Sequence, residues 1–126
     1  MTKEEALYQF WSGFGLVAME ENSMPTDDAD RPDFPYLTYT VATGDFGAEV
    51  PLSASLWYRS ASWVEANAKK DEISRAIGYG GTFLPSDGGG VWLKRGTPFS
   101  QSMGDPADNM IKRNYLNVTA EFLSAD

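Results

Sequence analysis

Cysteine and histidine are both missing from the 126-residue sequence. Without cysteine the chain has no disulfide, no thiolate nucleophile and no zinc–thiolate site. Without histidine it lacks the side chain that titrates nearest to neutral pH and that binds metals most often. A serine nucleophile also has no histidine partner with which to form a triad. We therefore expect a protein that is not an enzyme, with no catalytic residues, no metal and no cofactor.

Long hydrophobic runs and an excess of positive charge are missing as well. No stretch approaches about 20 consecutive apolar residues, which excludes a membrane-spanning helix. Residues 1–5 lack the apolar start of a signal peptide, so we expect synthesis in a cytoplasm. The net charge is −8, and residues 1–49 hold ten acids against Lys3 and Arg31. Such a chain offers no basic surface to the phosphates of a nucleic acid.

The residues that are present are enough for one hydrophobic core. Apolar residues make up 42% of the sequence and aromatic residues 13%, a composition that argues against global disorder. A length of 126 residues is typical of one domain. We expect residues 1–126 to fold as a single domain, because no repeat, linker or shift in composition divides them.

Caps and apolar periodicity predict two helices. Thr2 and Glu5 form a capping-box pattern, and apolar residues at helical spacing then predict a helix over 3–12: Leu7, Phe10, Trp11 and Phe14. Ser62 and Glu65 form a second such pattern, before a helix over 63–77 that ends at Gly78. The apolar side of this second helix is predicted to contain Trp63, Ala66, Ile73, Ala76 and Ile77.

Alternating and β-branched segments predict about five strands. Residues 36–42 and 52–59 form an antiparallel hairpin, and residues 82–85 and 91–95 form another around a glycine-rich turn. A polar stretch then leads to a last strand over 115–122. Residues 18–33 have no period and contain two prolines, which indicates a loop. The fold class is therefore α+β, an antiparallel sheet of about five strands with two helices packed on it, in the order α-β-β-α-β-β-β.

Three patterns invite a ligand and have simpler explanations. Asp27, Asp28 and Asp30 lack the glycine and glutamate of a calcium loop, which favours a solvated acidic loop. The glycines of residues 78–81 and 88–90 stand at a helix end and in a hairpin, whereas a phosphate loop opens a helix. Turn geometry explains both glycine clusters.

Two functions from other classes stay open. A carbohydrate-binding module would use a stacking platform formed by Trp57, Tyr58, Trp63 and Trp92. A carboxylate-dependent hydrolase would use two acids about 5–10 Å apart across a cleft, with the candidates Asp71, Glu72 and Asp87. Packing in a core or interface is the more frequent role of such aromatics, and surface ion pairing is the better explanation of Asp71 and Glu72.

Several segments, taken in order, resemble a family of phage proteins. They are PYLTY (35–39), LWYRS (56–60), DEI (71–73), AIG (76–78), LPSDGGG (84–90) and RGTPFSQ (95–101). In order and spacing they are similar to the tail terminator or neck proteins of long-tailed phages and prophages. The resemblance covers roughly residues 7–123, except that the acidic N-terminal third, including residues 18–33, matches no motif of the family.

The resemblance implies a structural role in a virion. Tail terminators are small α+β domains that form a hexameric ring, which caps the finished tail tube and docks the head connector. It implies as partners other copies of the chain, the tail tube protein and the head–tail connector protein, with DNA passing through the ring without specific binding. It also implies a place in the tail or neck of a virion made in the cytoplasm of a host bacterium. Another tail or neck adaptor is the alternative within this class.

We take eight residues as candidate assembly surfaces: Asp27, Asp28, Asp30, Asp87, Trp57, Trp92, Lys94 and Arg95. A closed ring needs two different patches on each subunit, and an aromatic-rich chain can supply them. We expect the negative charge to line or rim the channel, so that DNA does not adhere. We also expect the 18–33 loop and the glycine-rich hairpin at the axial faces, where tube and connector dock.

Overall fold

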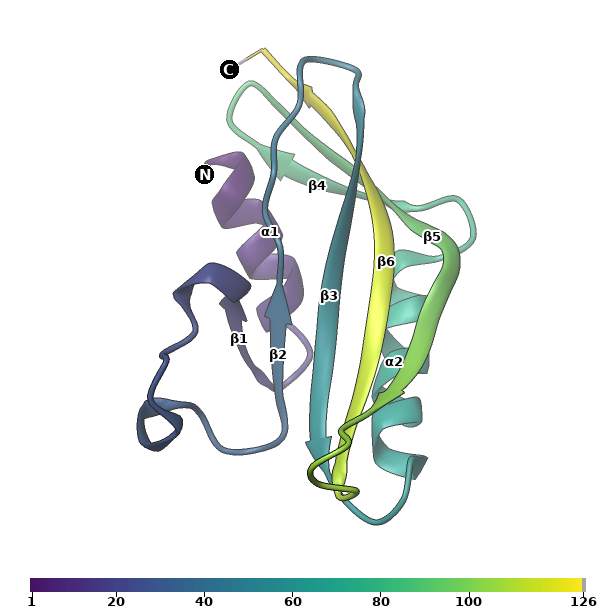
Figure 1. Ribbon diagram of the computed structural model, residues 1–126. Helices are drawn as coiled ribbons and strands as arrows, with labels where there is room; N and C mark the ends of the chain where they lie inside the picture. The colour runs from purple at the N-terminus through teal and green to yellow at the C-terminus, as the bar shows by residue number, and fades with distance from the viewer. Residues whose placement is uncertain (126) are drawn as a thin grey trace.

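The computed structural model describes residues 1–125, and Asp126 lies outside the described residues. The described chain forms a twisted six-stranded sheet with two α-helices on one face (Figure 1). The helices are α1 (Lys3–Ser12) and α2 (Val64–Ile77), with two short 3₁₀ helices, η1 (Glu21–Ser23) and η2 (Asp28–Asp30). The strands are β1 (Val17–Glu20), β2 (Tyr36–Tyr39), β3 (Glu49–Arg59), β4 (Thr82–Ser86), β5 (Gly89–Gly104) and β6 (Ile111–Ser124).

The strand order in the sheet is β1-β2-β3-β6-β5-β4. The α+β class is confirmed, as are both predicted hairpin pairs, β2 with β3 and β4 with β5. The predicted number and order of elements are close but not exact, because β1 is a sixth strand and the order is α-β-β-β-α-β-β-β. The sheet is also not wholly antiparallel, since β1 pairs with β2 in parallel. The strand β1 lies partly within residues 18–33, which the sequence pattern indicated as a loop.

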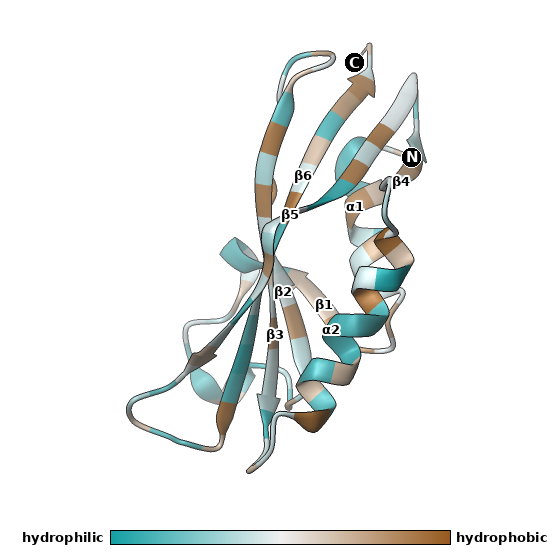
Figure 2. Ribbon diagram, turned by 90° about the vertical axis from the view of Figure 1, so that its right-hand side faces the viewer, coloured by the Kyte–Doolittle hydropathy of each residue, from teal (hydrophilic) through white to brown (hydrophobic). Residues whose placement is uncertain are grey.

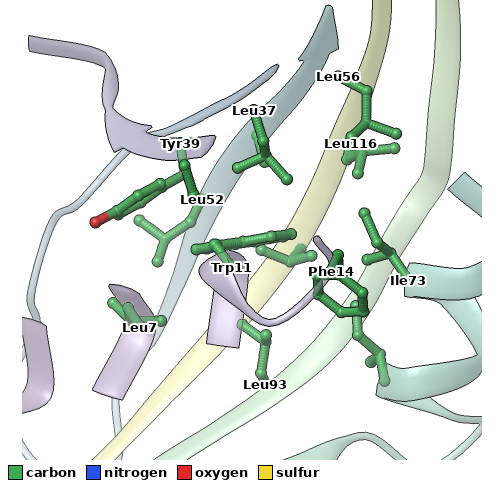
Figure 3. Packing of buried hydrophobic residues seen from close by; sticks show 14 of the residues in the cluster. Leu7, Trp11, Phe14, Leu37, Tyr39, Leu52, Leu56, Ile73, Leu93 and Leu116 are labelled. Atoms are coloured by element: carbon green, nitrogen blue, oxygen red, sulfur yellow. The ribbon is translucent and has the colours of Figure 1, made fainter. Parts of the chain in front are cut away.

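Helix α1 has the bounds that its pattern predicts. The Thr2 hydroxyl accepts a hydrogen bond from the Glu5 backbone N–H, and the Thr2 N–H donates to the Glu5 carboxylate, both at 3.1 Å. This capping box satisfies two N–H groups that the first helical turn leaves without partners. The helix buries Leu7 and Trp11 against the sheet, where Figure 3 shows them facing Tyr39 and Leu52.

Helix α2 begins differently from its prediction. Trp63 is the N-cap and its side chain makes no capping hydrogen bond, so the predicted Ser62–Glu65 capping box is wrong. The Ser62 hydroxyl instead accepts from the Val64 N–H, two residues on, at 3.1 Å. Ala66, Ile73 and Ile77 are buried as predicted, but Ala76 is exposed. Residues 66, 73 and 77 are spaced seven and four apart and share one stripe, whereas Ala76 is turned about 100° from Ile77.

Strands β5 and β6 extend into the segment predicted to be a polar connection. Strand β5 continues to Gly104 and β6 begins at Ile111, with a register shift in β5 between Arg95 and Ser100. The backbone at Gly96 approaches β6 so closely that an added Cβ would lie 2.9 Å from the Asn117 carbonyl oxygen. The polar side chains of this segment gave no pattern from which a strand could be predicted. They are compatible with a strand because the face of the sheet away from the helices does not require apolar residues. In the other direction, β2 ends at Tyr39 rather than at residue 42.

Candidate assembly surfaces

One face of the sheet carries no α-helix, and we call it the outer face. Figure 2 shows both helices on the other side of the twisted sheet. Successive side chains of a strand point to opposite faces, and in β6 the residues Leu116, Val118 and Ala120 are buried in the core. Their neighbours at odd positions of β3 and β6, such as Trp57, therefore point to the outer face. Neither α-helix covers this face of the sheet.

An aromatic and guanidinium row crosses the outer face of β2, β3 and β6. Tyr36, Trp57 and Arg113 are register partners in adjacent strands. The Tyr36 and Trp57 rings stack at 6.1 Å with an interplanar angle of 19°, and the Arg113 guanidinium lies 4.6 Å from the centre of the Trp57 ring. Trp57 Nε1 also donates to Thr38 Oγ1 at 2.9 Å. The Trp57 ring thus contacts Tyr36 on one side and Arg113 on the other. Burial raises the pKa of the Tyr36 hydroxyl.

We expect Arg113→Met to lower the free energy of unfolding by about 1–2 kcal/mol. The change keeps an aliphatic stem over Trp57 but removes the cation–π contact. It also removes the 3.0 Å hydrogen bond from Arg113 Nε to Ser55 Oγ. Urea denaturation followed by circular dichroism measures the loss.

Arg59→Met is the matched control, because Arg59 lies in the adjacent register row of the outer face. Its side chain is exposed and pairs with Asp108 at 3.3 Å, so its loss should cost no more than about 0.5 kcal/mol. Equal effects of the two changes would contradict the role assigned to the Trp57 contact.

The other end of the outer face contains Trp92 and Lys94 of β5. Trp92 packs against Phe83 of β4 with the ring centres 6.3 Å apart, and its Nε1 donates to the Gly80 carbonyl at 3.0 Å. Lys94 Nζ donates to Glu49 Oε1 of β3 at 2.9 Å, which raises the pKa of the Lys94 ammonium. This surface holds loop 78–81 against the sheet.

A hollow with positive charge lies where α2, loop 78–81 and the bend of β5 meet. Its volume is about 360 Å³, and we call it the cationic hollow; its lining is Tyr79, Lys94, Arg95, Gly96, Thr97 and Phe99. Arg95 points to the helix side of the sheet and donates to Ser74 Oγ of α2 at 2.8 Å. Tyr79 is fully exposed. It follows Gly78, whose φ of +78° turns the chain away from α2.

The acidic segment, residues 20–33, lies on the other side of the molecule. Six of its residues are acids, Glu20, Glu21, Asp27, Asp28, Asp30 and Asp33, and Arg31 is its one cation. Asp27 Oδ1 accepts from the Ala29 N–H at 3.0 Å and Arg31 Nε donates to the Pro25 carbonyl at 2.9 Å. The segment therefore has a defined conformation and an uncompensated negative charge.

A second hollow of about 480 Å³ separates the acidic segment from the β5–β6 turn. Its lining is Asp28, Arg31, Pro32, Asp33, Phe34, Tyr36, Asp105 and Ile111. In the turn, the Met110 backbone N–H donates to Asp108 and lowers the pKa of its carboxyl group, with Arg59 acting in the same direction. Within residues 1–125 no group of three or more carboxylates is placed to hold a metal ion.

The predicted site residues are distributed over several surfaces. Asp27, Asp28 and Asp30 share the acidic segment, while Trp92 and Lys94 share one end of the outer face. Arg95 points to the opposite face from Lys94, and Trp57 lies in the row with Tyr36. Asp87 stands in the β4–β5 turn, where its Oδ1 accepts from the Met1 amino group at 2.6 Å.

The residues that sequence reasoning missed are Tyr79 and Arg113. Tyr79 stands between glycines in a turn, where no side chain of its own segment can bury it. This pattern in the sequence could have predicted that Tyr79 is exposed. No local signal marked Arg113, because its contact with Trp57 depends on strand register.

The structure does not assemble the stacking platform that a carbohydrate-binding module would need. Trp57 and Tyr58 are consecutive in β3 and point to opposite faces, and Tyr58 is buried in the core. Of the hydrolase candidates, Asp71 pairs with Lys70 at 3.0 Å and Glu72 with Lys69 at 3.2 Å on α2, and Asp87 lies on another element, in the β4–β5 turn. The four aromatics therefore do not share one face, and both acids of α2 are in ion pairs with lysines.

Comparison with solved structures finds a chain of similar fold, described as "Virion of native gene transfer agent (GTA) particle". The match has a TM-score of 0.59 at 18% sequence identity and covers 94% of this chain and 92% of that chain. At this identity the likeness concerns the fold. No protein-family model and no curated protein matches the sequence. Among the described residues no helix has the length and apolar character needed to cross a membrane.

Proposed function

We propose that this chain is a structural virion protein, a tail terminator or neck protein that forms a ring at the end of a tail tube and docks the head connector. The observation that carries the proposal is the fold likeness, over 94% of the chain, to a chain of a gene transfer agent virion. The segment resemblance to tail terminators over residues 7–123 is consistent with it. The role consists of binding and needs no catalytic step.

The distribution of charge supports a ring. The acidic segment lies on one side of the sheet, and the end of α2 with the bend of β5 lies on the other (Figure 1). The cationic hollow is lined from this second side. Two unlike surfaces on one subunit allow heterologous contacts, and these close into a ring when the rotation between copies permits. The hexameric number comes from the family resemblance, and tail tube protein and head connector are the partners of the two ring faces. With a net charge of −8, DNA would pass through such a ring without specific binding.

The test is the position of the chain in particles from the cell that encodes it. Antibody against the chain, with gold detection in negative-stain microscopy, should label one place per particle, the end of the tail tube next to the head. Deletion of the coding sequence should give unjoined heads and tails of irregular length. Gold along the whole tube or on the capsid, or particles that lack the chain, would overturn the proposal.

A further inference from the structure

We propose that the cationic hollow of one copy receives the acidic segment of the next copy, so that copies associate head to tail. This inference rests on the ring in the proposed function and names the contact that closes it. It places the acidic segment between neighbouring copies, whereas the sequence suggested an axial face. The occupant of the hollow is a second copy of this chain.

The chain neutralises the positive charge of the cationic hollow only in part: Lys94 pairs with Glu49 at 2.9 Å, whereas Arg95 has no acidic partner among the described residues. Across residues 1–125 neither Arg75 nor Arg95 has a carboxylate within ion-pair distance. Arg95 lines the hollow and makes one hydrogen bond, to the neutral Ser74 hydroxyl. Arg75 is exposed and adjoins Ser74 in the last turn of α2. No carboxylate lines the hollow, so no acidic side chain in the described part of the same copy neutralises these two guanidinium groups.

Tyr79 gives the same surface an apolar anchor. Its side chain is fully exposed at the rim of the hollow. Tyrosine and arginine are, with tryptophan, the residues most enriched at the energetic centres of interfaces. A large aromatic side chain with no neighbours in its own chain loses little and gains contact area when a partner covers it.

The acidic segment has the complementary properties. Four of its five outermost carboxylates, those of Glu21, Asp27, Asp30 and Asp33, have no cation within ion-pair distance among the described residues, and Arg31 pairs with Asp28 at 3.1 Å. All five residues are exposed. Internal hydrogen bonds already hold the segment, so binding would order little additional chain.

The positions of the two surfaces require two molecules. Figure 1 shows the acidic segment at the left of the sheet and the end of α2 with the bend of β5 at the right, and in Figure 2 α2 stands nearer to the viewer than the acidic segment. One copy therefore cannot bring its own two surfaces together. Complementary charge on opposite sides favours repetition of one heterologous contact.

A nucleic acid is the other polyanion that could meet the hollow, and the charge distribution disfavours it. Residues 75–104 contain three cations and one acid, Asp87, while the whole chain carries −8. A duplex presents a long row of phosphates, which would also face the acidic remainder of the chain. The hollow, at about 360 Å³, can meet only a small part of such a row.

Two charge reversals and their mixture test the contact. Variant one carries Arg75→Glu and Arg95→Glu, and variant two carries Asp27→Lys and Asp30→Lys. Native mass spectrometry and mass photometry of the wild-type chain should show oligomers that weaken at least tenfold between roughly 50 and 500 mM salt. Each variant alone should be monomeric. An equimolar mixture should recover oligomers, with the two variants in equal numbers, because every contact then sets side chains of opposite charge at positions 75 and 95 against those at positions 27 and 30.

Controls separate the contact from general charge effects and from misfolding. Two single variants serve as controls for charge. Lys70→Glu reverses a positive charge and Glu65→Lys reverses a negative one, both on α2 and outside the lining of the hollow. Each should leave association unchanged. Tyr79→Asp alters a side chain without neighbours, so it should fold normally and weaken association at least tenfold. Circular dichroism verifies the fold of every variant.

Four results would overturn the inference. They are a wild-type chain that is monomeric at about 1 mM, a variant that still assembles, a mixture that does not, or a labelled DNA duplex that binds the wild type and not variant one. The particle experiment is independent. Gold at the tail end with unaffected variants would reject this contact and keep the proposed function, whereas charge-dependent association without labelling would reject the function and keep the contact.

Discussion

Replacing Gly89 with alanine should lower the free energy of unfolding by about 3 kcal/mol, through backbone strain and overpacking combined. Gly89 has a φ of +150°, which residues with a Cβ rarely adopt. An added Cβ would lie 1.8 Å from the Leu123 carbonyl oxygen and 2.9 Å from its carbon. These atoms belong to the β6 backbone, so no change of side-chain rotamer can relieve the clash.

The position of Gly89 makes the clash costly. Gly89 pairs with Ser86 of β4 and with Ser124 of β6, so moving it away from Leu123 disturbs two neighbouring strands. The β4–β5 turn that contains Asp87 would move with it. Urea denaturation and the yield of folded protein measure the effect.

Gly104→Ala is the matched control in the same strand. No atom lies within 4 Å of a Cβ at Gly104, and its φ is not in the unfavourable range. We expect a change within about 0.5 kcal/mol, as for other surface substitutions. A Gly89→Ala variant as stable as Gly104→Ala would show that β6 yields at this point.

Replacing Trp11 with alanine should cost about 3–5 kcal/mol, the range for truncating a large buried aromatic. Trp11 is 1% exposed and lies between α1 and the sheet. Its ring stacks on Tyr39 of β2 with the centres 6.4 Å apart and meets the edge of Phe10 at 5.0 Å. The cavity left by the indole cannot be filled by neighbours that are fixed in two different elements.

Tyr8→Ala controls for the loss of an aromatic side chain from α1. Tyr8 is 51% exposed, so the change should cost no more than about 1 kcal/mol. Denaturation curves of both variants, recorded by far-ultraviolet circular dichroism, give the comparison. A loss below about 1 kcal/mol for Trp11→Ala would mean that α1 contributes little to the stability of the sheet.

The parts of the fold that could be predicted depend on contacts close in the sequence. The capping box of Thr2 and Glu5 and the apolar spacing of Leu7 and Trp11 lie within α1 itself, and the helix has its predicted bounds. The alternation in β6 likewise identifies its buried residues. Such signals are readable because the groups involved are separated by two to four residues.

Strand β1, which the sequence pattern does not predict, shows the limit of inference from neighbouring residues. Strand β1 has four residues, and no alternation distinguishes them from a loop. It becomes a strand because β2, about 19 residues later, offers a parallel partner, with Val17 opposite Tyr36. The length of β5 has the same origin. Its polar residues do not indicate a strand, and it continues as one because β6 supplies hydrogen-bond partners.

Of the two candidate surfaces, one could be predicted from the sequence and the other could not. The acidic segment was visible in the sequence, since its charges are consecutive and its composition keeps them exposed. The cationic hollow was not, because Arg95 approaches Ser74 only after β5 bends at its irregularity next to α2. Lys94 and Arg95 were both candidates, and the pleat sends them to opposite faces.

The sequence by itself determined what this protein lacks and what its local elements are. The missing cysteine and histidine, the uneven charge, both α-helices and the alternating strands follow from residue types and short-range spacing. Only the tertiary structure decided the sixth strand, the row that joins Tyr36, Trp57 and Arg113, and the placement of opposite charges on opposite sides. The reason is that strand register and sheet order depend on hydrogen bonds between segments far apart in the chain, which no local pattern encodes.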